Sequence, residues 1–230
     1  MKKCLALLLC ALMLISPALA VKIKPQDLSQ VEVTFDPSVD PALTQQLGSW
    51  GAPSDWAKAE VAAAVAADLV PVLTGNPSYQ DAITREQFAE LAFNLVLMTT
   101  PGRNFGYTPP FDDCDNHDVV LAAALGIVNG VGNNKFDPKT TTNREQIATM
   151  LCRAVRYIEG ATRETYLSAP ADLGQFSDRS EISSWAAEGV GLLAANGIMK
   201  GTSDTTASPG NPCTVEQAIL LVYRLYQQIG

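Results

Sequence analysis

Three short phrases recur along this chain and decide its fold: Thr84-Arg85-Glu86-Gln87, Asn143-Arg144-Glu145-Gln146 and Thr214-Val215-Glu216-Gln217. Each phrase opens an apolar segment. The interval from Gly126 to Arg144 is the same as that from Gly197 to Val215. A phrase that recurs at a kept distance from a second signal indicates an internal repeat. The sequence therefore predicts three copies of one structural unit.

Each phrase has the features of a helix start. Thr84, Asn143 and Thr214 carry a side-chain oxygen that accepts the free N–H groups of a first turn. The side-chain oxygen of the glutamine three residues later can accept a hydrogen bond from the cap N–H, which makes a capping box. The intervening glutamate lies near the positive end of the helix dipole. The arginine is different, because capping does not require it and the third copy has Val215 in its place.

The residues after each phrase are apolar at helical spacing: Phe88, Leu91, Ala92, Leu95; Ile147, Met150, Leu151, Ala154, Val155; Ala218, Leu221, Val222, Leu225. A shorter helix is expected before each of them, over residues 54–69, around residues 119–124 and over residues 183–195. Trp56 is expected on the inward face of the first. The predicted fold is all-α, with three helix–loop–helix units that must pack together because one unit alone buries too little apolar surface.

Residues 1–20 have the pattern of a secretory signal peptide. Lys2 and Lys3 precede an apolar run, and Ala18-Leu19-Ala20 supplies small residues for cleavage. The run is too short to span a membrane. We therefore expect a secreted chain without membrane insertion. Lipidation at Cys10 is the less favoured alternative, because the large Leu9 precedes it.

The chain is acidic, with 16 Lys+Arg against 24 Asp+Glu and a formal net charge of -8 at pH 7. Nucleic-acid binding requires a basic surface, so no nucleic-acid partner is expected. An anionic ligand would have to be held by a local pocket that contains arginine, because the overall field repels it.

Cysteine and histidine usage argues against a metal site or an active site. Cys114, Cys152 and Cys213 remain after the leader, an odd number that leaves at least one thiol unpaired. Cys152 falls on a core-facing helix position, and a disulfide between two of the three stays open. Their spacing does not resemble a zinc site, and His117 is the only histidine. With no nucleophile–base arrangement in view, we expect no catalytic residue, no metal and no cofactor.

Further motifs recur in a fixed order around the phrases: Phe111-Asp112-Asp113, Gly126-Ile127-Val128-Asn129-Gly130 and Phe136-Asp137-Pro138; Phe176-Ser177-Asp178, Trp185-Ala186 and Gly197-Ile198-Met199-Lys200-Gly201; Trp56-Ala57 and Ile83-Thr84-Arg85-Glu86. Together they resemble the S-layer homology (SLH) repeat. The expected organisation is a signal peptide over 1–20, an extended lead-in over 21–49, and SLH-like repeats over 50–100, 110–160 and 172–230.

The resemblance implies a pseudo-threefold helical bundle at the cell wall of a Gram-positive-type bacterium. It implies non-covalent anchoring through a secondary cell-wall polysaccharide, commonly pyruvylated, that binds in grooves between units. Arg85 and Arg144 would hold the ketal carboxylate, since a planar fork suits two oxygens. The other candidates are Asp113 and Asp178 for sugar hydroxyls, Trp56 and Trp185 for the pyranose ring, and Gly130 and Gly201 for close backbone approach.

Simpler roles stay open for the same residues. The tryptophans can be core residues, the aspartates turn formers, and the arginines partners in surface ion pairs of little energetic value. No unit carries the complete pattern: the third has Val215, the second has no tryptophan, and the first has no clear Phe-x-Asp. We expect at most two working grooves, those of Arg85 and Arg144. The alternative function is a secreted scaffold with degenerate grooves that binds another envelope protein.

Overall fold

The computed structural model describes residues 47–100 and 110–230. The predicted signal peptide, the lead-in up to residue 46 and the connection over 101–109 lie outside the described residues. The predictions for those segments, and the repeat boundaries, therefore stay predictions.

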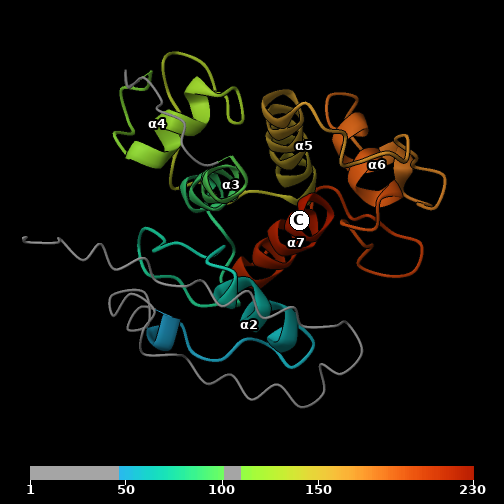
Figure 1. Ribbon diagram of the computed structural model, residues 1–230, viewed down its shortest axis with the longest axis horizontal. Helices are drawn as coiled ribbons and strands as arrows, with labels where there is room; N and C mark the ends of the chain where they lie inside the picture. The colour runs from blue at the N-terminus through green and yellow to red at the C-terminus, as the bar shows by residue number, and fades with distance from the viewer. Residues whose placement is uncertain (1–46, 101–109) are drawn as a thin grey trace, which may run out of the picture.

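The described residues form six complete α-helices, a helical turn at residues 47–49 and no sheet, which confirms the all-α prediction (Figure 1). The helices are α2 (Lys58–Ala66), α3 (Arg85–Thr99), α4 (His117–Ala124), α5 (Arg144–Thr162), α6 (Ala187–Ala195) and α7 (Val215–Ile229), with a 3₁₀ turn at Arg179–Glu181. Each long helix begins at a repeated phrase, and all three capping boxes are present. Among these described helices, none combines the length and the apolar character that a bilayer crossing requires.

Helices α2 and α6 begin later than the sequence predicted, and this changes where the tryptophans lie. Residues 54–57 form a turn in which Ala57 N–H donates to Ser54 O over 2.8 Å. Ala57 is fully buried, whereas Trp56 is 60% exposed, so its expected inward position is wrong. Trp185 is 56% exposed beside a fully buried Ala186. Core packing is therefore the wrong interpretation of both tryptophans, because the small residue that follows each one fits the close approach to the bundle.

The long helices α3, α5 and α7 form the centre, and each short helix packs on the long helix of a different unit (Figure 1). Helix α4 packs on α3, α6 on α5 and α2 on α7. In each unit, the loop between the short and the long helix therefore leads the chain from the long helix of a neighbouring unit to the start of its own long helix. Because α2 of the first unit covers α7 of the last, the two ends of the described chain close the ring.

A cycle of three backbone hydrogen bonds marks the pseudo-threefold axis. Ile83 N–H donates to Cys213 O (2.9 Å), Cys213 N–H to Thr142 O (3.2 Å), and Thr142 N–H to Ile83 O (2.9 Å). Each of these residues directly precedes the cap of a long helix. The cycle brings the three helix starts together, which places the repeated phrases at the junctions between units and confirms the predicted pseudo-threefold arrangement.

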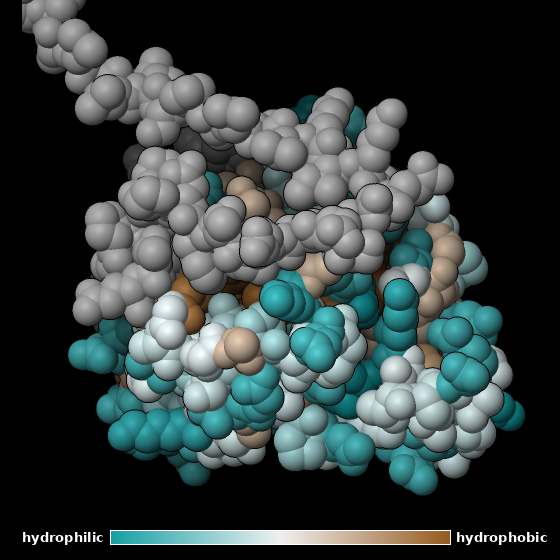
Figure 2. Space-filling view, turned by 90° about the horizontal axis from the view of Figure 1, so that it is seen from below, coloured by the Kyte–Doolittle hydropathy of each residue, from teal (hydrophilic) through white to brown (hydrophobic). Residues whose placement is uncertain are grey.

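Apolar side chains from all three units fill one continuous core. Cys114, Cys152 and Cys213 are free thiols buried within it, so none of them forms a disulfide. Burial raises the pKa of Cys213 to about 12, which keeps this thiol protonated and inert. The lower part of the face in Figure 2 is mainly hydrophilic over its described residues.

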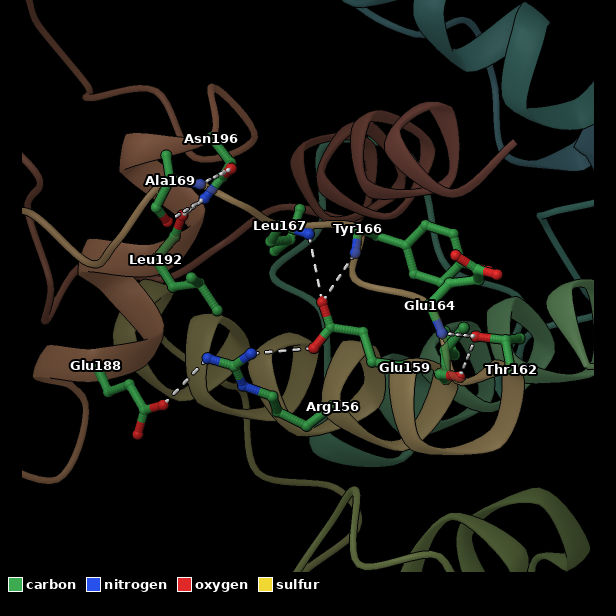
Figure 3. Close-up of polar contacts among 11 residues, drawn as sticks. Arg156, Glu159, Thr162, Glu164, Tyr166, Leu167, Ala169, Glu188, Leu192 and Asn196 are labelled. Atoms are coloured by element: carbon green, nitrogen blue, oxygen red, sulfur yellow. Dashed lines mark hydrogen bonds and ion pairs between the residues drawn. The ribbon is translucent and has the colours of Figure 1, made fainter.

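The segment after α5 is held against the bundle by two polar side chains (Figure 3). Glu159 accepts the N–H groups of Tyr166 (3.0 Å) and Leu167 (3.3 Å). Asn196, at the end of α6, exchanges two hydrogen bonds with the backbone of Ala169. These contacts direct the buried Leu167 into the core and lead the chain from α5 toward the third unit.

Candidate functional site: grooves between the repeats

Arg144 lies at the first turn of α5, and its side chain forms hydrogen bonds with a loop of the third unit. Its Nε donates to Ala207 O and its Nη2 to Lys200 O, each over 2.7 Å. The residue is only 6% exposed, and burial lowers its pKa, although Cys213 and Asp178 oppose that shift. Arginine stays charged in proteins. Within the described part of the chain, Nη1 makes no hydrogen bond, so the end of the guanidinium is left for a ligand.

Asp178 binds the N–H groups of the same loop, whereas Arg144 binds its carbonyl oxygens. Its carboxylate accepts the N–H groups of Ala207 (2.8 Å) and Ser208 (2.7 Å). Burial acts to raise the pKa of Asp178, but these two hydrogen bonds and the charge of Arg144 hold it below its usual value. Arg144 therefore binds the carbonyl oxygen of Ala207 and Asp178 binds its N–H group. These contacts, which we call the loop clamp, give the aspartate a structural role in fixing the loop.

A groove of about 340 Å³ opens beside this clamp. Its lining comes from all three units: Trp56, Arg144, Lys200, Gly201, Thr202, Gln217, Leu220, Leu221 and Arg224. The structure thus brings three of the predicted residues, Trp56, Arg144 and Gly201, to one cavity, with Asp178 behind the loop that forms its edge. We call this cavity the Arg144 groove.

The glycine in this loop has a structural reason of its own. A Cβ on Gly201 would collide with the carbonyl oxygens of Ser203 and Thr206. At Gly130, the matching position of the second unit, a Cβ would lie 2.6 Å from Lys135 O and 2.9 Å from the Phe111 ring. Tight loop closure therefore requires both glycines, whether or not a ligand approaches them.

Arg85 repeats the arrangement of Arg144 at the junction of the first and second units. Its Nε donates to Phe136 O and its Nη2 to Asn129 O, both over 3.0 Å, and its guanidinium lies 4.8 Å from the Phe136 ring centre. Asp113 accepts the N–H groups of Phe136 (2.8 Å) and Asp137 (3.0 Å), and these bonds lower its pKa. Because this junction is equivalent to the Arg144 groove, we call it the Arg85 groove.

Ion pairing, the simpler role considered for the arginines, does not occur in the described residues for either Arg85 or Arg144. Both guanidinium groups bind backbone carbonyl oxygens instead. The Nε–Nη2 side of each fork is therefore occupied by protein. A carboxylate would have to approach the end of the guanidinium, from Nη1, rather than its side.

The third junction has lost the same features. Val215 is fully buried where the arginines stand, although its N–H makes the equivalent bond, to Asp81 O at 3.0 Å. The loop position of Gly130 and Gly201 is taken by Val72, which follows the left-handed Asp68 at the same interval as the glycines follow Gly126 and Gly197. Asn116 accepts the first helical hydrogen bond of its unit, as Ser54 and Ser183 do in theirs, so Asp118 stands where the other units have tryptophan. Because this junction is equivalent to the Arg144 groove, we call it the Val215 groove.

The glutamates of the phrases tie neighbouring units together, a role that the sequence analysis missed. Glu216 accepts from the N–H and the hydroxyl of Ser54, each over 2.8 Å. Glu145 binds Ser183 in the same way, at 2.9 and 3.0 Å, and Glu86 accepts from the Asn116 side chain at 2.9 Å. These contacts set the turns that carry Trp56 and Trp185. A signal existed, since a serine stands two residues before each tryptophan.

Comparison with known proteins agrees with this architecture. The family model of the S-layer homology domain matches residues 110–148 and 175–219. An endoglucanase of Bacillus sp. strain KSM-635 is 28% identical over 166 residues, which are 69% of this chain and 17% of the relative. A surface layer protein of Brevibacillus choshinensis is 28% identical over 134 residues, or 58% of this chain and 11% of the relative.

A third relative spans more of the chain. The surface-layer 125 kDa protein of Lysinibacillus sphaericus is 24% identical over 193 residues, 82% of this chain but 16% of the relative. The chain thus covers less than a fifth of the length of each of these three proteins. Two segments of this chain are therefore similar to the S-layer homology domain, and they lie in the second and third units of the pseudo-threefold bundle.

Proposed function

We propose that this protein attaches to the bacterial cell surface by binding an anionic secondary cell-wall polysaccharide in its inter-repeat grooves. One observation carries the proposal: Trp56, Arg144 and Gly201, from three different units, line one cavity. The two segments that match the S-layer homology domain and the surface layer names of two relatives support the cell-surface part.

The chemistry of the Arg144 groove suits an acidic sugar. Charge-assisted hydrogen bonds from the guanidinium end can hold a carboxylate such as that of a pyruvate ketal. The exposed Trp56 offers an apolar ring face to a pyranose. Lys200 and Arg224 line the same cavity. In a chain of net charge -8, this local concentration of basic groups gives an anion a favourable place to bind.

The Arg85 groove is proposed as a second, weaker site. It repeats the arginine, the glycine and the exposed tryptophan through Arg85, Gly130 and Trp185. The Val215 groove, which lacks all three, is proposed to be silent. Two sites of unequal strength would bind a repeating polymer more tightly than either site alone, because the second contact is intramolecular.

The test is a binding isotherm of residues 21–230 on sacculi from a bacterium with a pyruvylated secondary polymer. Sacculi stripped of that polymer serve as the ligand control. We expect binding to intact sacculi only, and a loss of at least tenfold in Arg144→Ala, with a further loss in the Arg85→Ala, Arg144→Ala double variant. The matched control is Val72→Ala, an exposed change in the Val215 groove, which should bind as the parent does.

Two results would overturn the proposal. Binding to no sacculi at all would direct the search to a protein partner of the envelope. Equal binding by the folded double variant would remove the arginines from the site. Circular dichroism and thermal unfolding of each variant separate a lost contact from a lost fold, because both arginines also hold loops.

A further inference from the structure

We infer that Arg224 is a second anion contact of the Arg144 groove, so that a bound acid lies between two guanidinium groups. The inference rests on the proposed function and specifies its ligand: a glycan whose acidic group is presented at the open end of Arg144. Arg224 was absent from the predicted site residues, and it lines the groove from α7.

The hydrogen bonds of Arg224 leave much of its donor capacity unused. Its Nη2 lies 2.8 Å from Glu60 Oε2 on α2, and its Nη1 makes only a long bond, 3.5 Å, to Ile198 O. Its Nε is buried and has no hydrogen-bond partner in the described structure. Because Nε is buried, a groove ligand would engage Nη1, and the ion pair at Nη2 need not break.

The ion pair with Glu60 orients Arg224 before a ligand arrives. The two side chains are 20% and 26% exposed, and they come from α7 and α2, helices of the last and the first unit. A guanidinium that is already held in place loses less side-chain entropy when it binds an anion. The Glu60 charge has an opposite effect, since it offsets part of the positive charge that faces the ligand.

The Arg85 groove supplies a natural contrast. Arg153 stands at the same interval after Arg144 as Arg224 does after Val215, but the α6 position that matches Glu60 is Gly189. A Cβ on Gly189 would lie 2.9 Å from Ala148 O, so the α5–α6 packing excludes any side chain there. The arrangement of an arginine held by a carboxylate therefore belongs to the Arg144 groove and not to the Arg85 groove.

A purely structural ion pair and a ligand contact predict different signs for two substitutions. If the pair only holds α2 on α7, Arg224→Gln and Glu60→Gln remove the same interaction and should affect binding alike. If Arg224 contacts the anion, Arg224→Gln removes an attraction, whereas Glu60→Gln removes an opposing charge and keeps a polar side chain beside Nη2. The two variants should then change affinity in opposite directions.

The experiment measures isotherms of residues 21–230 on intact sacculi and on sacculi whose pyruvate ketals have been removed by mild acid. We expect Arg224→Gln to weaken binding to intact sacculi about tenfold, Arg224→Lys to weaken it less, and Glu60→Gln to strengthen it about two- to threefold. On acid-treated sacculi, the affinities of these variants should differ little from that of the parent protein. Arg156→Gln is the matched control: it removes an exposed, ion-paired arginine that does not line the Arg144 groove, and it should bind as the parent does.

The outcomes separate this inference from the proposed function. If the parent protein binds intact sacculi and loses binding in Arg144→Ala, but Arg224→Gln binds as the parent does, the inference alone is overturned. Parallel weakening in Arg224→Gln and Glu60→Gln, with lowered unfolding temperatures, would also overturn it. No binding of the parent protein to intact sacculi would overturn both.

Discussion

The Arg144 groove and the Val215 groove occupy equivalent positions around one pseudo-threefold axis, yet their surfaces have different chemistry. The first combines a buried arginine, a loop glycine and an exposed tryptophan. The second has Val215, Val72 and Asp118 at those places. Both junctions nevertheless keep the capping box and the backbone bond of the first helical residue. The features shared by both maintain the fold, and the features confined to one are the candidates for binding.

Among substitutions that test this comparison, we expect the largest loss of stability from a change of the loop glycine. Gly201→Ala places a Cβ against the carbonyl oxygens of Ser203 and Thr206, so the loop must shift. We expect a loss of about 2–4 kcal/mol in the free energy of unfolding, measured by urea denaturation. Val72→Ala, at the matching loop position of the Val215 groove, should change it by less than about 0.5 kcal/mol. Equal effects would contradict the loop argument.

The next effect concerns the glutamates that join neighbouring units. Glu216→Ala leaves the Ser54 N–H and hydroxyl without their acceptor at a site where Glu216 is 2% exposed. We expect a loss of about 2–3 kcal/mol in the free energy of unfolding. Glu86→Ala should cost less, because Glu86 is only half-buried and accepts from one side chain, that of Asn116. Hydrogen exchange should show faster opening of α2 in Glu216→Ala; unchanged protection would refute the link.

The tryptophan substitutions should act on binding and hardly on stability. Trp56→Ala removes a 60% exposed ring from the wall of the Arg144 groove. We expect binding to sacculi to weaken about tenfold, which corresponds to about 1.4 kcal/mol, with the unfolding temperature nearly unchanged. Asp118→Ala, at the same position of the Val215 groove, should leave binding as it is. A large loss of stability in Trp56→Ala would revive the core interpretation.

The smallest effect is a pH dependence of the loop clamp. The pKa of Asp178 is lowered in the folded state, so the carboxylate contributes stability at pH values above its unfolded pKa and loses that contribution as the pH falls through the folded value. We expect Asp178→Asn to cost about 1 kcal/mol at neutral pH, since the group is partly exposed. The difference from the parent protein should shrink below about pH 4. A constant difference would exclude the charged form as the stabilising species.

The helix starts could be predicted from the sequence, whereas the composition of the grooves could be predicted only in part. The capping boxes at Thr84, Asn143 and Thr214 depend on residues three apart, and local chemistry predicted them correctly. Trp56 was placed wrongly because apolar spacing cannot tell a helix face from the turn before the helix. Arg224 was missed because its relation to Arg144 and Glu60 joins three units that are far apart in the chain.

By itself the sequence determined that this chain has three copies of one helical unit, that each long helix starts at a repeated phrase, and that one copy lacks the arginine. These properties follow from local hydrogen bonding and from helical periodicity. Only the tertiary structure decided that each short helix packs on the long helix of another unit, and that Trp56 therefore lines the same cavity as Arg144. The physical reason is that the grooves are made at junctions between units, where packing across the pseudo-threefold axis selects which side chains share a cavity.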